Sequence, residues 1–159
     1  MFRSMRRFRQ ELSQEECREV LAQQRRGCLA LQGDDGYPYA LPINFWFDPE
    51  SGHVYFHGAP AGHKIDAMKR SDKVSFCVFE KTGAKREDDW AETVRSVICF
   101  GRLEVVTDPG RKERALRQIG LRYYPSAGEV EDEIRQTIGR VAVLELSVEH
   151  MSGKRVHER

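Results

Sequence analysis

The chain has 159 residues, of which 40% are hydrophobic and 32% are charged, and its formal net charge is +1. This length predicts a single domain, residues 1–159, with one hydrophobic core. The balanced charge argues against nucleic acid as a partner. No apolar run reaches about 18 residues, so we expect no membrane partner. The basic start, residues 1–10, lacks the apolar centre of a secretory signal, so we expect a cytoplasmic protein.

The first predicted elements are a helix and three strands. Residues 13–16 form a capping box, and apolar residues follow at helical spacing, which predicts a helix that ends near Gly27. Three extended runs follow, separated by turn residues, and they cover residues 27–32, 37–47 and 53–57. Pro38 and Pro42 cannot donate to a strand ladder, so the second strand is expected at an edge, bulged, or free to face a ligand.

The rest of the chain adds three strands and three helices. The strands are predicted at residues 74–79, 95–106 and 141–146, with a kink or bulge at Gly101, and the helices at 63–70, 109–120 and 129–138. Residues 80–92 are an exposed polar excursion in which Trp90 is the one apolar anchor. Six strands without regular strand-helix alternation favour a mainly β fold, a closed antiparallel barrel with flanking helices.

The four cysteines do not suggest a metal or redox motif. Cys17, Cys28, Cys77 and Cys99 are scattered, and none is paired as C-x-x-C. We expect buried free thiols. His57 and His63 have no third ligand at metal spacing, so no metal site is predicted.

The most informative segment lies between the third strand and the next helix. A small-residue loop follows His57, and His63-Lys64 opens the helical pattern, so basic side chains gather near free backbone N–H groups. This arrangement predicts an anion-binding corner suited to a terminal phosphate. The alternative is a strand-loop-helix junction whose charges are only solvated.

The order of several segments resembles the pyridoxamine-phosphate-oxidase-like flavin proteins, and within them the nitroimidazole-resistance group. The matching segments are Pro38-Tyr39-Ala40-Leu41-Pro42-Ile43-Asn44, Tyr55-Phe56-His57-Gly58, Gly62-His63-Lys64-Ile65-Asp66-Ala67-Met68, Val74-Ser75-Phe76, Ser96-Val97 and Phe100-Gly101. The similarity covers residues 5–154. It implies a six-stranded FMN-binding split barrel with an N-terminal helix and a short basic arm. It also implies a homodimer with cofactor sites at the subunit interface.

The resemblance implies a set of cofactor-binding residues. They are Pro42, Ile43 and Asn44 on the second strand, His57 and Gly58 after the third, His63 and Lys64 at the helix start, and Ser96 from the partner chain. Position 63 is histidine where vitamin B6 oxidases carry arginine, and residues 148–159 do not match their substrate-binding end. Pyridoxine-phosphate oxidation is therefore not expected.

The function implied by this resemblance is an FMN-dependent oxidoreductase that reduces nitroaromatic compounds such as 5-nitroimidazoles. His57 is the candidate catalytic residue, because it could donate a hydrogen bond or proton as charge builds on a nitro group. The alternatives are a non-catalytic flavin- or heme-binding protein, and a related barrel that uses the deazaflavin F420.

Overall fold

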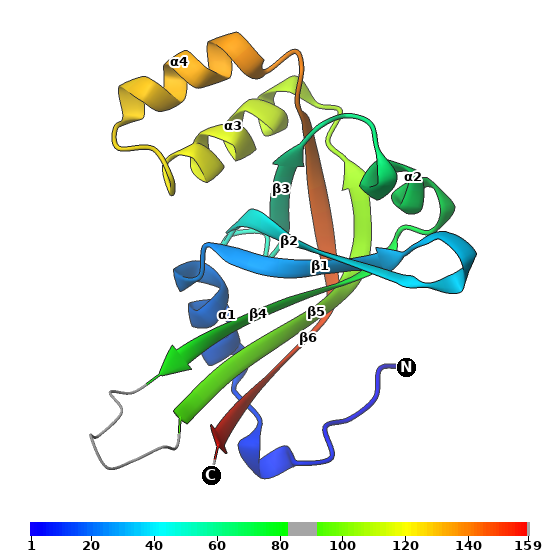
Figure 1. Cartoon of the computed structure of the whole chain (residues 1–159). Coiled ribbons are helices and arrows are strands. Elements are labelled where there is room, and N and C mark those ends of the chain that lie inside the picture. The colour runs from blue at the N-terminus through cyan, green and yellow to red at the C-terminus, as the bar shows by residue number, and fades with distance from the viewer. Residues whose placement is uncertain (83–91, 159) are drawn as a thin grey trace.

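Six antiparallel strands form a closed barrel in the order β1-β2-β3-β6-β5-β4 in a computed structural model, which describes residues 1–82 and 92–158 (Figure 1). This architecture confirms the predicted fold class. The strands are β1 (Arg26–Gln32), β2 (Pro38–Phe47), β3 (Val54–Gly58), β4 (Lys73–Thr82), β5 (Glu92–Val105) and β6 (Ala142–Glu158).

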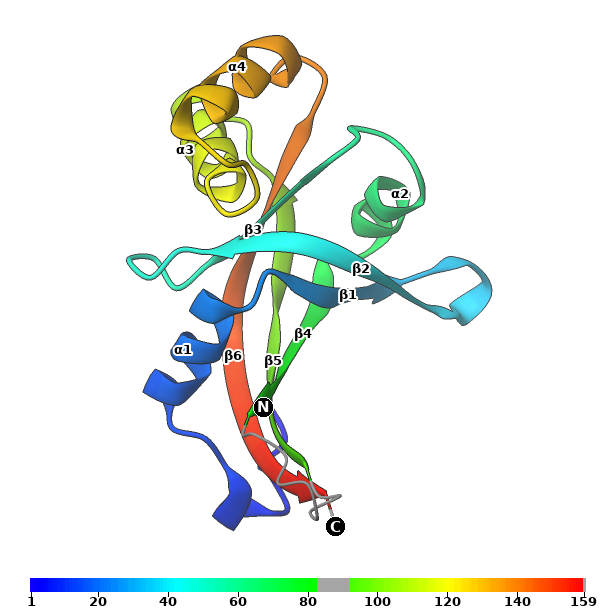
Figure 2. The same ribbon diagram turned by 60° about the vertical axis from the view of Figure 1, so that its left-hand side comes forward.

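Among the described residues, four α-helices lie outside the barrel (Figure 2). They are α1 (Gln14–Gln23), α2 (His63–Arg70), α3 (Pro109–Gly120) and α4 (Ala127–Thr137), and two short 3-10 turns, η1 (Phe8–Gln10) and η2 (Asp34–Gly36), complete the elements. Helices α3 and α4 form a hairpin at one end of the molecule, and the C-terminus lies at the other end (Figure 1). No helix in the described ranges is both long and apolar enough to span a membrane.

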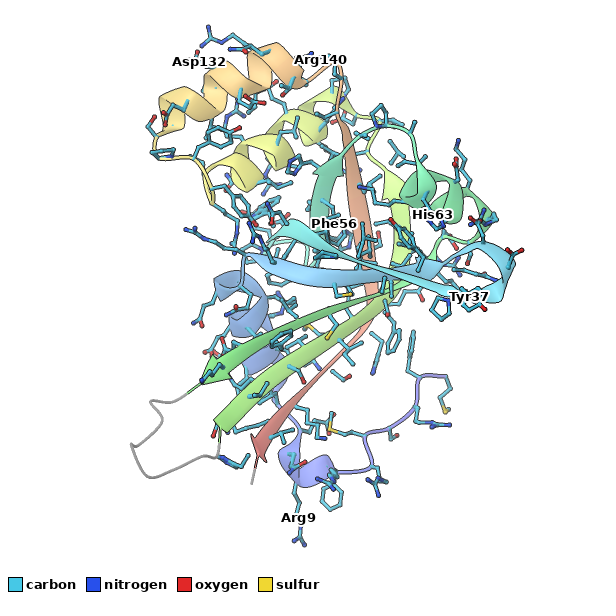
Figure 3. All side chains as sticks on the ribbon, viewed as in Figure 1. Arg9, Tyr37, Phe56, His63, Asp132 and Arg140 are labelled. Carbon is cyan, nitrogen blue, oxygen red and sulfur yellow. The ribbon has the colours of Figure 1, made fainter. Side chains whose placement is uncertain are left out.

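The barrel interior is an aromatic and aliphatic core. Phe76 contacts Phe45 and Phe56 edge to face, with ring centroids 4.9 and 5.0 Å apart, an arrangement that suits the quadrupoles of aromatic rings. Figure 3 shows Phe56 inside the barrel. Helix α1 adds its buried face to this core, and it begins with the predicted capping box, because Ser13 and Glu16 each accept the other's backbone N–H.

A second, smaller apolar cluster attaches the α3–α4 hairpin to the barrel. It joins Trp46 of β2 and Tyr55 of β3 to the buried faces of both helices. The turn after α3 is also tied to the end of α1, because Arg122 donates to the backbone carbonyls of Ala22 and Gln24. The hairpin is therefore held by packing on one side and by hydrogen bonds on the other.

Two predicted boundaries are wrong. Helix α1 ends at Gln23, and Gly27 lies inside β1 rather than at a helix cap. A Cβ at Gly27 would lie only 2.4 Å from the Phe76 ring, so tertiary packing explains this glycine. Strand β6 continues to Glu158 instead of ending at residue 146, because it pairs with β5 from Val105 to Glu92.

Other predictions have mixed outcomes. The helices at 63–70 and 109–120 are confirmed, and a register shift between Phe100 and Gly101 confirms the predicted irregularity. Cys17 and Cys99 are buried free thiols as predicted, but Cys28 is exposed and Cys77 is half-buried, because both lie on the outer face of the barrel. Glu80, predicted to begin an exposed excursion, instead lies in β4 and is only 8% exposed, whereas the prediction for Trp90 lies outside the described residues.

Candidate functional site

Strand β2 has one open edge. Residues 38–44 pair with β1 on one side, while β3 pairs only with residues 45–47 on the other. In the described part of the chain, no strand covers this second edge. Pro42 lies opposite Cys28 and has no N–H to donate. Backbone groups along this edge are therefore available to a ligand rather than to the sheet.

The corner after β3 brings two basic side chains together. His57 and Gly58 end β3, and a loop leads to Gly62, which precedes α2 with a φ of 111° and no capping side chain. The Lys64 side chain folds back over Gly58, so that a Cβ built on this glycine would lie 2.6 Å from Lys64 Nζ. Glycine at position 58 thus leaves room for the ammonium group beside His57.

The Lys64 charge is not compensated by any described residue. Burial lowers the pKa of Lys64, and no carboxylate among the described residues pairs with it. The pKa of His57 is also lowered, first by burial and then by the Lys64 charge, and His57 Nδ1 is buried without a hydrogen-bond partner in the described structure. A half-buried ammonium without a counter-charge favours the binding of an anion.

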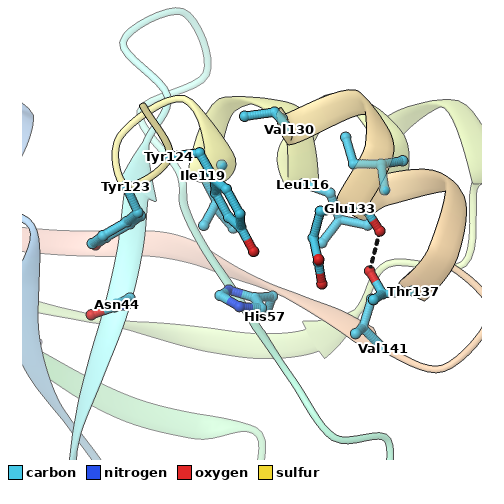
Figure 4. A pocket seen from close by; sticks show the side chains of 12 residues that line it. Asn44, His57, Leu116, Ile119, Tyr123, Tyr124, Val130, Glu133, Thr137 and Val141 are labelled. Carbon is cyan, nitrogen blue, oxygen red and sulfur yellow. Dashed lines mark hydrogen bonds between the residues drawn. The ribbon is translucent and has the colours of Figure 1, made fainter. Parts of the chain in front are cut away.

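Two hollows meet at Asn44 and His57. The first, of about 370 Å³, is lined by residues of β1, β2 and β3, and Arg26 Nε donates to Asn44 Oδ1 over 3.0 Å at its edge. The second, of about 310 Å³, lies between the barrel and the α3–α4 hairpin (Figure 4). The residues lining the first hollow are Arg26, Pro42, Ile43, Asn44 and His57. The first hollow forms a groove beside β2, and His57, which lines it, adjoins the basic corner, while the second hollow lies beneath the helical hairpin.

Six of the eight predicted site residues lie together. Pro42, Ile43, Asn44 and His57 line the first hollow, and Gly58 and Lys64 are at the adjoining corner. Their proximity follows from the barrel, which places the β2 edge beside the end of β3. Their predicted contacts with a cofactor remain predictions.

His63 and Ser96 lie apart from this group. The His63 ring stacks on Tyr39 with centroids 3.9 Å apart, and its Nε2 lies 3.4 Å from Asp34 Oδ2. Figure 3 shows His63 near the β1–β2 hairpin. Ser96 lies on β5, opposite Phe79 and Lys154, and lines neither hollow. Ser96 is predicted to reach the cofactor that the partner chain binds, and the structure of a single chain does not test this prediction.

Glu133 and Thr137 line the second hollow and were not predicted from the sequence. These residues share one face of α4 with the buried Val130 and Ile134, at positions three, four and seven residues apart. Polar residues within an apolar helical stripe are the signal that could have identified them. Arg26 was also missed, because an arginine at the start of a strand carries no pattern of its own.

An antiparallel barrel with one open strand edge beside a basic corner defines the split-barrel class. The chain belongs to the pyridoxamine 5'-phosphate oxidase family, because the model of that family matches residues 13–155.

Similar proteins include a reductase and flavin-binding structures. A 5a,11a-dehydrotetracycline/5a,11a-dehydrooxytetracycline reductase of Streptomyces rimosus subsp. rimosus is 29% identical over 90 residues, a match that spans 55% of this chain and 60% of that protein. An FAD-binding protein of Mesorhizobium loti is 25% identical, with a TM-score of 0.66 over 92% of this chain and 96% of that one. A proposed 5-nitroimidazole resistance protein of Bacteroides thetaiotaomicron is 21% identical, with a TM-score of 0.74 over 93% of this chain and 87% of that one, which supports the fold.

Proposed function

We propose that the protein binds FMN in the groove beside β2, with the phosphate at Lys64. The observation that carries this proposal is the half-buried Lys64 ammonium, which lies over Gly58 and lacks a counter-charge among the described residues. A terminal phosphate dianion would supply that counter-charge, together with hydrogen bonds to the uncapped first turn of α2. The FAD-binding protein of Mesorhizobium loti supports a flavin more broadly.

The rest of the groove suits the flavin rings. The first hollow is bounded by Pro42 and Ile43, whose apolar surface favours a planar ring system, and by Asn44, whose amide can bind a polar ring edge. The open edge of β2 offers backbone groups to the same ligand. His63 remains a predicted phosphate contact, although it would first have to leave Tyr39 and Asp34.

The activity we propose is reduction of a planar nitroaromatic compound. The flavin would supply hydride or electron transfer. His57 would hold the acceptor, because a neutral imidazole with an unpartnered Nδ1 can donate a hydrogen bond where negative charge develops. The similar reductase of Streptomyces rimosus supports reduction as the reaction class.

We further propose a homodimer formed through the outer face of β4 and β5. Phe79 is 70% exposed, and Ile98 and Phe100 are each 39% exposed. Apolar side chains gathered on one sheet face are typical of a protein interface. Ser96 lies opposite Phe79 on this face, so the proposed dimer would bring it to the partner. Phe79→Glu should give a monomer in light scattering after size exclusion, and an unchanged mass would contradict this interface.

The experiment that tests the cofactor is the absorption spectrum of the purified protein, followed by titration with FMN. We expect a flavin spectrum and an affinity that falls about 10- to 150-fold in Lys64→Ala, which removes a charge-assisted hydrogen bond. Lys69→Ala is the matched control, because this lysine of the same helix is 71% exposed. A colourless protein that takes up no FMN would overturn the proposal, and a Soret band would favour the heme alternative.

The activity has a separate test. NADH or NADPH should bleach the bound flavin, and added 5-nitroimidazole should restore its colour. In His57→Gln the flavin should still bind, while reoxidation by the nitro compound becomes slower by a factor of about 100 or more. If nitroimidazole does not restore the colour of the wild-type protein, a flavin carrier is the better assignment.

A further inference from the structure

The cavity under the α3–α4 hairpin has apolar walls and a small number of polar groups. Its walls come from both helices and from Val141, just before β6, and its volume of about 310 Å³ is at the lower end of the range for small-molecule sites. The apolar lining residues are Leu116, Ile119, Val130, Ile134 and Val141. The polar groups are Tyr124, Glu133 and Thr137 from the hairpin and Asn44 and His57 from the barrel (Figure 4). Such a cavity suits a compact ring compound.

Glu133 differs from the other acidic residues of α4. Glu131 pairs with Arg117 at 2.5 Å, Asp132 pairs with Arg135 at 2.8 Å, and Glu129 completes the capping box of the helix. Glu133 has no basic partner among the residues described, and it faces the cavity instead (Figure 4). Glu133 therefore presents a carboxylate without a cationic partner, among the described residues, to a largely apolar space.

Tyr124 and Thr137 do not neutralise this charge. Burial and the Glu133 carboxylate raise the pKa of Tyr124, so its hydroxyl stays protonated and can donate to Glu133. The Thr137 hydroxyl donates to the backbone carbonyl of Glu133 over 2.8 Å, which leaves the carboxylate itself untouched. A carboxylate accepts several hydrogen bonds, so capacity for a ligand remains.

The opposite wall of the cavity carries no negative group. His57 Nδ1 is buried and unpartnered in the described structure, and Asn44 offers an amide. A ligand that enters the cavity therefore meets a carboxylate at the hairpin and neutral polar groups at the barrel. This arrangement disfavours phosphates and carboxylates and favours a positive charge or an N–H donor.

We propose that this cavity holds the non-reacting part of the substrate, a compact aromatic molecule with a cationic amine or N–H donor bound to Glu133. The opposite edge of the molecule then faces His57, where the cavity meets the groove beside β2. The inference rests on the proposed function only in treating the ligand as a substrate. The binding preference itself depends on the cavity alone.

The test compares three probes that share a naphthalene ring and carry a cationic, a neutral or an anionic group: naphthalenemethylamine, naphthalenemethanol and naphthoate. Calorimetric titration of the purified protein should show the amine binding most tightly and naphthoate most weakly. Glu133→Gln should lower the affinity for the amine about tenfold or more and leave the alcohol nearly unchanged. The matched control is Asp132→Asn on the outer side of α4, which should change neither affinity (Figure 3).

Each outcome decides the proposal. Equal affinity for all three probes, or an amine preference that persists in Glu133→Gln, would overturn it. The flavin spectrum of the same samples is recorded independently. An amine preference in a protein that binds no FMN would support the cavity assignment and contradict the proposed function, whereas bound FMN without a preference would contradict the cavity assignment alone.

Discussion

The two ends of β3 each carry a histidine, and their surroundings are opposite. His53, just before the strand, lies 2.5 Å from Glu145, a carboxylate that is 2% exposed and that also accepts from Arg111. His57, near the other end, has a lysine rather than a carboxylate beside it, and its Nδ1 is unpartnered in the described structure. The end with the His53–Glu145 pair, the paired end, stabilises the fold. The end with His57, the unpaired end, is where a ligand can supply the hydrogen-bond partner that Nδ1 lacks.

The largest effect is expected at the paired end. Glu145→Ala removes a buried carboxylate and leaves His53 and Arg111 without their partner, although Arg111 is half exposed and can be solvated. We expect the free energy of unfolding to fall by about 2–3 kcal/mol, measured by urea denaturation. Glu149→Ala, which breaks an exposed pair with Arg102, should change the free energy of unfolding far less. Equal losses of unfolding free energy in the two variants would show that burial does not distinguish these ion pairs.

At the unpaired end, Lys64→Met should have opposite effects on stability and on binding. Removing an uncompensated ammonium should raise the unfolding free energy of the flavin-free protein by a few tenths to about 1 kcal/mol, because the group is only half-buried. FMN affinity should fall about 10- to 150-fold. Lys69→Met controls for the loss of one positive charge on the same helix. A destabilised Lys64→Met protein would indicate a structural lysine instead.

A smaller change at the same corner is Gly58→Ala. The new Cβ would lie 2.6 Å from Lys64 Nζ, so the flexible end of the lysine must move while the backbone stays in place. We expect FMN affinity to fall roughly 3- to 10-fold, with less than about 1 kcal/mol lost in stability. Fluorescence titration and urea denaturation of one preparation measure both. Unaltered affinity would mean that the ammonium position is not important for binding.

The smallest expected effect concerns pH. Because the pKa of His57 in the folded chain lies below its ordinary value of 6.5, the unfolded chain takes up a proton first as the pH falls. The stability that neutral His57 contributes is complete above pH 6.5 and is lost as the pH falls through the folded pKa. Between about pH 7.5 and about pH 5, His57→Gln should therefore lose less stability than the wild type. Parallel pH profiles of unfolding would contradict this.

Local patterns predicted most of the fold. The capping box at Ser13, Pro109 at the start of α3 and the alternation of β4 are signals that neighbouring residues supply, and they identified the elements correctly. The end of β6 could not be predicted in this way, because its polar residues form a strand only through pairing with β5. Gly27 was misplaced for a related reason, since contact with Phe76 rather than a helix cap requires glycine there.

The candidate site also combines residues that local sequence predicts with residues that only tertiary contacts bring into place. Lys64 and His57 were predicted because the loop between them has a recognisable order, and the structure places them together. The position of His63 on Tyr39 depends on the β1–β2 hairpin, which is distant in the sequence. Glu133 reaches the cavity because α4 folds back over the barrel, and its place in the apolar stripe of α4 predicts a packed face but not what that face packs against.

The contacts between the α3–α4 turn and the end of α1 suggest how distant changes reach the cavity. Arg122 and the Tyr123 hydroxyl bind backbone carbonyls of residues 22–25, and 98 positions of sequence separate Arg122 from Gln24. Shortening Arg122, which does not line the cavity, would loosen one wall of the ligand space from outside. Natural variation at position 122 could therefore retune ligand selectivity in relatives that keep every lining residue unchanged.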